Sequence, residues 1–202
     1  MWEKIVFASI LLAANSVLAQ SPSNEELLSE LRKGGYVLFI RHPKTNPDQA
    51  DTDPLHLDNV KAQRQLSDEG RKQAEMLGET LRGFKIPVEK VISSKFYRAQ
   101  EASKLLALGD VVVELDVSEG GLVVSPNENK RRAMALRELL ATQPAEGKNR
   151  IIVSHKPNLQ DAAGKDFGDL SEAEIVIFKP LGDGKFKVIA RVMPEAWNEW
   201  IK

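Results

Sequence analysis

The stretch Tyr36–Thr45, with the sequence YVLFIRHPKT, decides the fold of this chain. Its first five residues are aromatic or aliphatic, which indicates a short, fully buried β-strand. The strand ends at Arg41 and His42, and Pro43 opens the loop that follows. In open α/β sheets, ligands bind in the crevice beyond the carboxyl ends of the strands. We therefore expect Arg41 and His42 to lie at a ligand-binding site.

Residues 1–19 have the pattern of a secretory signal peptide. An apolar run, Ile5–Leu12, follows a short polar start, and the small residues Val17 and Ala19 fit a cleavage point after Ala19. The alternative is a retained membrane anchor, but the apolar stretch of about fifteen residues is shorter than the roughly twenty needed to span a bilayer. We expect a periplasmic or secreted protein with no stable membrane anchor after signal removal.

The rest of the chain is predicted to form one domain, 36–202, preceded by an N-terminal helical segment, 20–35. About 180 residues are enough for one sizeable hydrophobic core. The formal net charge of the whole chain is −1, which argues against a nucleic-acid partner, because such proteins carry a strong basic excess. The absence of cysteine excludes disulfides, zinc–thiolate sites and thiol nucleophiles.

Helical and strand patterns alternate along the domain. Capping boxes at Ser23–Glu26 and Ser125–Glu128 start two of the helices. The expected helices cover 23–33, 67–83, 96–108 and 125–141, and the expected strands cover 36–40, 88–92, 111–115, 150–154, 174–179 and 185–192. The last two strands form a hairpin around 181–184. This order predicts a three-layer α/β/α sandwich with a mostly parallel central sheet and an antiparallel edge hairpin.

The segment Pro43–Gln65 has no sustained period and is rich in proline and aspartate. We expect it to be a solvated loop that borders the active site, because long loops in compact domains tend to be functional or mobile. A calcium site at Asp51–Asp53 is disfavoured, since the glycine and distal glutamate of an EF-hand loop are missing.

Three predicted strands end beside cationic or reactive side chains. Arg41 and His42 follow the first strand, Arg98 lies just after the second, and His155 follows the fourth. If these strands are parallel neighbours, the four side chains converge and form an anion site, because arginine binds phosphate oxygens through paired hydrogen bonds. A metal site is disfavoured, since the histidines lack the H-x-H or H-E-x-x-H spacing and arginine repels a cation.

Four motifs in order resemble those of the histidine phosphatase (phosphoglycerate-mutase-like) superfamily. Arg41-His42 with Thr45 is similar to its Arg-His-Gly-x-Thr signature, and Leu66–Ala74 is similar to its Leu-Thr/Ser-x-x-Gly-x-x-Gln-Ala helix start. Ser93–Ala102 resembles the block with Arg-Ala-x-x-x-Ala, and Ile151–His155 resembles the last block, a strand that ends in Gly/Ser-His.

This resemblance implies a phosphomonoester hydrolase that needs no metal or other cofactor and acts on a small-molecule or sugar phosphomonoester. His42 is the implied nucleophile, which forms a covalent phosphohistidine, and Arg41, Arg98 and His155 bind and stabilise the phosphoryl group. Thr45 and Arg64 are candidate substrate contacts. For the general acid, the resemblance leaves two carboxylates open. Glu174 resembles a motif of the exported branch that includes heptose-phosphate phosphatases, and Glu114 resembles the position in phosphoglycerate mutases.

One departure keeps other functions open. Pro43 stands where the family has glycine, which removes a backbone N–H and fixes φ. A catalytically weak or inactive phosphate-ligand binding protein of the same fold is one alternative to the hydrolase. A phosphomutase is another, although export is at odds with a cytoplasmic pool of sugar phosphates.

Overall fold

A mixed sheet is the centre of the molecule. The computed structural model describes residues 23–120 and 124–199, and within these ranges six strands form one sheet in the order β3-β2-β4-β1-β5-β6. The strands are β1 Val37–Arg41, β2 Val88–Ser94, β3 Val111–Glu114, β4 Asn149–Ser154, β5 Ile175–Gly182 and β6 Lys185–Val192. The first four are parallel, and β5 and β6 form an antiparallel hairpin on the β1 side.

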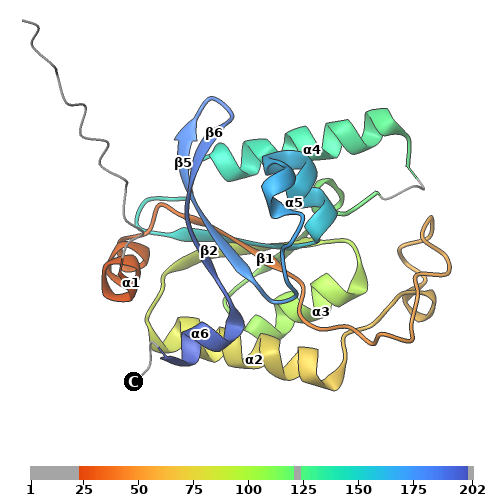
Figure 1. Ribbon diagram of the computed structural model, residues 1–202, viewed down its shortest axis with the longest axis horizontal. Coiled ribbons are helices and arrows are strands. Elements are labelled where there is room, and N and C mark those ends of the chain that lie inside the picture. The colour runs from red at the N-terminus through yellow and green to blue at the C-terminus, as the bar shows by residue number, and fades with distance from the viewer. Residues whose placement is uncertain (1–22, 121–123, 200–202) are drawn as a thin grey trace, which may run out of the picture.

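Helices cover both faces of this sheet (Figure 1). The α-helices are α1 Asn24–Lys33, α2 Asp68–Gly83, α3 Tyr97–Leu106, α4 Pro126–Ala141, α5 Lys156–Ala163 and α6 Pro194–Glu199. Short 3-10 helices lie at η1 Val60–Ala62, η2 Leu115–Val117 and η3 Lys165–Phe167. In Figure 1, α4 and α5 lie above the sheet, and α2, α3 and α6 lie below it.

Alternation along the strands divides the core into two layers. In β1, Leu38 and Ile40 pack with α1, α2 and α3, whereas Val37 and Phe39 pack with α4 and α5. Successive side chains of a strand point to opposite faces, so a strand that is apolar at every position can serve both layers. The predicted three-layer sandwich is therefore confirmed.

Two details of the expected elements differ in the structure. Ser125 caps α4 by accepting the N–H of Glu128, but the carboxylate of Glu128 binds Arg131 and Arg132 instead of completing a capping box. The hairpin turn is also tighter than expected. It consists of Asp183 and Gly184, both with positive φ, as a two-residue type I′ turn requires.

The predicted signal peptide and loop residues 121–123 lie outside the described ranges. Among the described residues, no helix is both long and apolar enough to cross a membrane.

Candidate active site

The register of the parallel strands brings the two candidate histidines together. Arg41 of β1 is paired with Ser154 of β4, so the next residues, His42 and His155, leave the sheet side by side. Their ring centroids are 5.1 Å apart, and both side chains are buried. Ser94, at the end of the neighbouring strand β2, lies 2.7 Å from His155 through its hydroxyl group. The expected convergence of strand ends is thus present.

His42 is held in one tautomer by the residue that follows it. Its Nδ1 lies 2.9 Å from the carbonyl oxygen of Pro43. A carbonyl oxygen only accepts hydrogen bonds, so Nδ1 carries the proton and Nε2 keeps a free lone pair. The imidazole is thereby arranged to act as a nucleophile through Nε2.

Arg98 is a fully buried cation that the chain neutralises with two carboxylates. It lies in the first turn of α3 and donates to Asp51 at 3.0 and 3.2 Å and to Glu119 at 2.6 Å. Its guanidinium also stacks on the ring of Phe96, 4.3 Å from the centroid. A buried charge is tolerated only when it is paired in this way.

Two buried nitrogen atoms of this cluster have no hydrogen-bond partner among the described residues. They are Nε of Arg98 and Nδ1 of His155, which lies 3.5 Å from a Glu119 oxygen. Because native proteins leave few buried polar atoms unpaired, such atoms call for an explanation. Unpaired nitrogen atoms on an arginine and a neighbouring histidine are typical of a site that binds anions.

Burial and positive charge hold both imidazoles neutral. Desolvation, followed by the charge of Arg98, lowers the pKa of His42 from 6.5 to about 3. The same two causes, in the same order, lower the pKa of His155 well below 6.5. At neutral pH both rings are therefore uncharged, and His42 is already in the form that can attack an electrophile.

Arg41 and Thr45 both contact the carboxylate of Glu172. Arg41 donates to the carbonyl oxygen of Leu170 at 2.6 Å and approaches the carboxylate of Glu172 to 3.7 Å. The Thr45 hydroxyl group donates to the same carboxylate at 3.1 Å. Arg64, from the loop, contributes positive charge to both histidines, and its guanidinium forms no ion pair with a residue that the structure describes. It remains available for an anionic ligand.

In the described part of the chain, the two carboxylates considered as general acid form no hydrogen bond or ion pair with Arg98, His42 or His155, although the carbonyl oxygen of Glu174 accepts the N–H of Arg41 at 3.1 Å. Glu174 is buried at the start of β5, where it accepts hydrogen bonds from Nε of Arg191 at 2.6 Å and from the N–H of Ser171 at 2.8 Å. The side chain of Glu114 is exposed at the end of edge strand β3.

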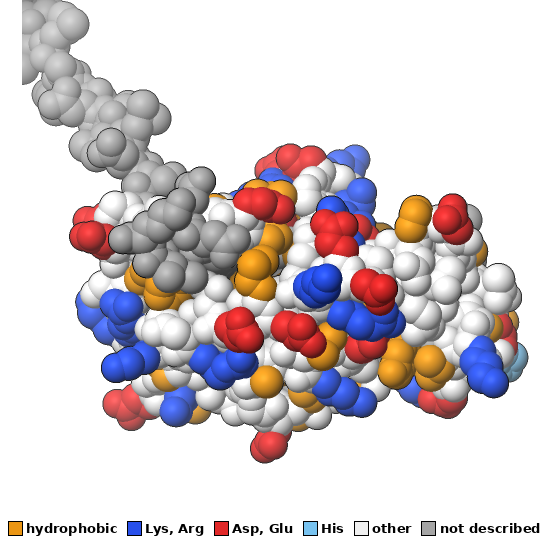
Figure 2. Space-filling view, turned by 90° about the horizontal axis from the view of Figure 1, so that it is seen from below, with side chains coloured by type: hydrophobic (Ala, Val, Ile, Leu, Met, Phe, Trp, Pro, Cys, Tyr) orange, Lys and Arg blue, Asp and Glu red, His pale blue; other side chains and the backbone are white. Residues whose placement is uncertain are grey.

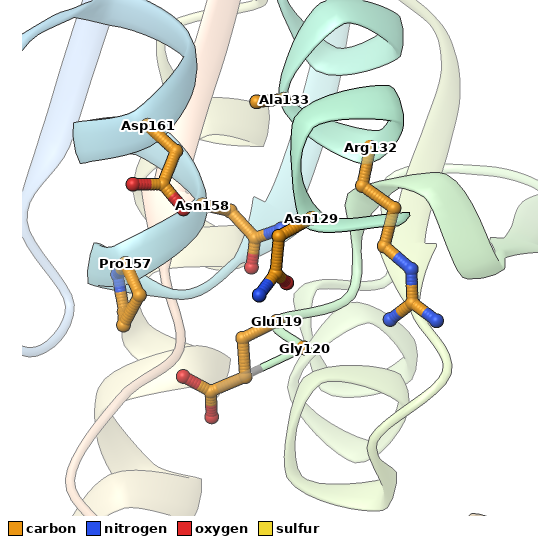
Figure 3. Close-up of a pocket in the computed structure, with 8 residues that line it drawn as sticks. All are labelled: Glu119, Gly120, Asn129, Arg132, Ala133, Pro157, Asn158 and Asp161. Atoms are coloured by element: carbon orange, nitrogen blue, oxygen red, sulfur yellow. The ribbon is translucent and has the colours of Figure 1, made fainter. Parts of the chain in front are cut away.

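Glu119 and Asp51 are the carboxylates that pair with Arg98; this role was not predicted for Glu119, and for Asp51 the sequence suggested only the disfavoured calcium site. Glu119 follows η2, which is fixed to β4 by a 2.5 Å hydrogen bond between the Ser154 hydroxyl group and the Val117 carbonyl oxygen. Figure 3 shows Glu119 beside a small cavity of about 60 Å³ between α4 and α5, with its carboxylate directed away from the amides of Asn129 and Asn158. The signal for Glu119 was its position before glycine in a loop after a strand; Asp51 had no local signal for this pairing.

Comparisons with known proteins agree with this geometry. The family model described as histidine phosphatase superfamily (branch 1) matches residues 37–120. The mitochondrial serine/threonine-protein phosphatase Pgam5 of Drosophila yakuba is 32% identical over 78 residues, which are 39% of this chain and 24% of that protein. The chain thus spans about a quarter of the length of this relative.

Solved structures share the fold at low sequence identity. The protein histidine phosphatase SixA in complex with tungstate has a TM-score of 0.55 at 18% identity, covering 80% of this chain and 98% of SixA. A mutant phosphoserine phosphatase of Entamoeba histolytica with phosphoserine has a TM-score of 0.56 at 13% identity, covering 79% and 98%. The family model matches one segment of this chain, and the solved structures share its fold.

Proposed function

We propose that this protein is a phosphomonoester hydrolase that works through a covalent phosphohistidine at His42, without a metal ion. The observation that carries the proposal is the buried pair of neutral imidazoles beside Arg98, with Nε2 of His42 unprotonated. The ring of His155 lies beside His42, and the charges of Arg98 and Arg41 act on His42, which supports their role in binding a phosphoryl group at this nitrogen. Their positive charge and donor groups suit the transition state of phosphoryl transfer.

The reaction has two steps. Nε2 of His42 forms a bond to phosphorus, and the bond between phosphorus and the ester oxygen breaks, so that the oxygen leaves with a proton. Water then attacks the phosphohistidine, the bond between nitrogen and phosphorus breaks, and inorganic phosphate is released. Because neutral His42 needs no deprotonation, its nucleophilic form persists at any pH well above 3.

We assign the general acid to Glu119. Its carboxylate lies 3.5 Å from His155 and 2.6 Å from Arg98, whereas Glu174 is engaged by Arg191. Phosphate oxygens that bind Arg98 would release Glu119 to protonate the leaving oxygen and later to accept a proton from water.

The test of the covalent intermediate is a rapid-quench experiment with a radiolabelled phosphomonoester. We expect an acid-labile, base-stable label on His42 and a fall in turnover of about a thousandfold or more in His42→Ala. Free phosphate as the product distinguishes hydrolysis from the isomerised ester of a mutase. Unlabelled protein, together with undiminished activity in His42→Ala, would contradict the proposal. Tight binding without any release of phosphate would favour the binding-protein alternative.

Leaving-group dependence tests the general acid. Glu119→Gln is expected to lower kcat by about 10²–10⁴ for alkyl phosphates and much less for p-nitrophenyl phosphate, whose leaving group needs no proton. Glu174→Gln and Glu114→Gln serve as the comparison. If one of these two shows the selective loss instead, the acid is that residue and Glu119 is a partner of Arg98 only.

We further propose that the protein is exported, on the basis of the pattern of residues 1–19. Mass analysis of the protein recovered from cell fractions is expected to find a chain that begins at Gln20 outside the cytoplasm. A cytoplasmic chain that retains Met1 would contradict export.

A further inference from the structure

A cavity of about 380 Å³ opens beside the anion site and has no role in the chemistry described above. Its described walls come from the loop after β1, from Lys95 between β2 and α3, from Leu115, Glu119 and Val124, and from Arg132 of α4. Cavities of this size accommodate small organic ligands. Its aliphatic lining residues are Leu55, Leu57, Leu115 and Val124, and the others are Pro54, His56, Asp58, Lys95, Glu119 and Arg132.

Glu119 connects the cavity to the catalytic cluster. Its side chain lines the cavity and also holds Arg98 at 2.6 Å. A phosphoryl group bound between Arg98 and His42 would therefore direct its ester oxygen toward Glu119 and the rest of its substrate into the cavity. The cavity is in the position of a leaving-group subsite.

Leu55 and Leu115 are the exposed aliphatic side chains of the cavity, whose wall also carries the polar side chains of His56 and Asp58. The side chain of Leu55 is 68% exposed and that of Leu115 is 41% exposed, an unfavourable arrangement for large apolar groups unless something covers them. Lys95, in contrast, already pairs with Asp58 at 3.4 Å, and Arg132 pairs with Glu128 at 2.8 Å. Sugar hydroxyl groups would find these charged partners engaged, whereas an alkyl or aryl group would cover the leucines.

The loop wall is fixed to the catalytic helix. The amide group of Gln63 donates to the carbonyl oxygen of Leu57 at 2.6 Å, and its oxygen accepts the N–H of Tyr97 at 2.7 Å. Tyr97 is the first residue of α3 and the neighbour of Arg98. These contacts hold the apolar wall at a fixed distance from Arg98, the proposed phosphate-binding residue. A subsite that discriminates between leaving groups requires such a fixed distance.

We propose that this cavity selects phosphomonoesters of apolar alcohols or phenols over those of sugars. The inference rests on the proposed phosphatase function and refines its substrate class. It narrows the expectation of a small-molecule or sugar phosphomonoester, which came from the resemblance alone.

The test is a series of n-alkyl phosphates from ethyl to octyl, in which the leaving-group chemistry stays constant while apolar length grows. Each buried methylene is worth about 0.8 kcal/mol, so kcat/KM is expected to rise about threefold to fourfold per carbon until the cavity is full. Hexyl phosphate is expected to exceed ethyl phosphate, and also glucose 6-phosphate, by about 100-fold. Equal rates along the series, or faster hydrolysis of the sugar phosphate, would overturn the proposal.

Exposed leucines provide matched variants. Leu55→Ser and Leu115→Ser are expected to flatten the dependence of kcat/KM on chain length, with each variant's own value for ethyl phosphate as the reference. The control is Leu181→Ser in the β5–β6 hairpin, where the leucine is 62% exposed and does not line the cavity. It should keep the wild-type slope. If all three variants keep that slope, the cavity is not the subsite.

Binding of phosphonates that cannot be hydrolysed tests the proposed subsite independently of the proposed hydrolase activity. Hexyl and ethyl phosphonates, which cannot be hydrolysed, are compared by titration calorimetry with the wild-type protein. A hexyl preference of about 100-fold supports the subsite even if no ester is turned over, a result that would overturn the hydrolase alone. Equal affinities of the two phosphonates overturn the subsite while leaving hydrolysis intact.

Discussion

At the scale of single residues, Pro43 is the departure whose consequence the structure clarifies. Proline lacks the backbone N–H, but the contact that His42 makes with this residue uses the carbonyl oxygen, which every residue type has. The tautomer of His42 therefore does not depend on a glycine at position 43. What proline adds is a fixed φ directly after the nucleophile, which favours a constant ring orientation.

The buried imidazoles give the protein a characteristic pH dependence of stability. The pKa of His42 is lowered by burial to about 3, so between pH 6.5 and 3 the unfolded chain binds a proton that the folded chain does not. Stability is thus fully present above pH 6.5 and is lost as pH falls through this window. His155 acts in the same direction.

The predicted effect of His42→Gln follows from this linkage. Between pH 6 and 4 its free energy of unfolding should fall less steeply than that of the wild type, by about 1.4 kcal/mol per pH unit, because one titrating group is removed. Urea unfolding at a series of pH values measures the two slopes. Parallel curves would show that His42 titrates normally in the folded protein.

Sequence patterns located the cationic residues of the site but not its carboxylates. His42 and His155 could be predicted to meet because strand ends of a parallel sheet share one edge. Asp51 reaches Arg98 from 47 positions away, through a loop without a period, so only the path of the folded loop brings them together. Glu174 was chosen by resemblance, and its ion pair with Arg191 depends on the register between β5 and β6.

At the scale of elements, the loop between β1 and α2 combines two functions. It supplies Asp51 to the anion site and Leu55 and Leu57 to the adjacent cavity. The sequence identified it as a loop at the active site from its prolines and aspartates, but composition could not show which aspartate turns inward.

Asp51→Asn should bind anions more tightly. The change removes a negative charge from Arg98 and keeps the oxygen that accepts the N–H of Arg64 at 3.0 Å. We expect the dissociation constant of inorganic phosphate to fall about tenfold, because close charges at a partly buried site interact by more than 1 kcal/mol. Calorimetry measures it, with Asp48→Asn, exposed on the same loop, as the control. Equal effects of both changes would indicate only a general change in net charge.

The contact between α2 and α3 depends on a glycine. A Cβ at Gly78 would lie 2.0 Å from the carbonyl oxygen of Leu106, whereas a Cβ at Gly83 of the same helix meets nothing within 4 Å. Gly78→Ala is expected to lower the free energy of unfolding by about 2 kcal/mol or more. Gly83→Ala should be neutral or stabilising by up to about 1 kcal/mol. Chemical denaturation compares the two, and similar values would contradict the close contact.

At the scale of the whole molecule, the helix before the predicted domain is part of the same core. Leu27, Leu28 and Leu31 of α1 are buried against the lower face of the sheet. Asn149 of β4 connects α1 to the sheet. Its amide group donates to the carbonyl oxygen of Leu31 at 2.7 Å and accepts the N–H of Tyr36 at 3.2 Å. Amphipathic spacing predicted α1, but no local pattern predicted this buried amide.

Loss of that amide should destabilise the molecule as one unit. Asn149→Ala leaves buried backbone groups unpaired and is expected to lower the free energy of unfolding by about 2–4 kcal/mol in a single transition. Asn127→Ala, at an exposed position of α4, should change it by less than about 0.5 kcal/mol. Two separate transitions in the Asn149 variant would instead show that α1 unfolds independently.

The attraction of the site for phosphate is local. The net charge of the chain is −1, and Figure 2 shows acidic and basic side chains interspersed on the face that carries α2. Phosphate binding at the proposed site would therefore depend on short-range contacts with Arg41, Arg64 and Arg98. Added salt is expected to weaken such binding less than it weakens binding that depends on long-range electrostatic attraction.

The carboxylates that pair with Arg98 also bear on product release in the proposed hydrolysis. When inorganic phosphate departs, Asp51 and Glu119 can return to the guanidinium at 3.0 and 2.6 Å, so the arginine is never left buried without a counter-ion. The chain thus competes with its own product for the same cation. In the proposed phosphatase, such an internal competitor is expected to shorten the residence of phosphate and to make the protein resistant to product inhibition.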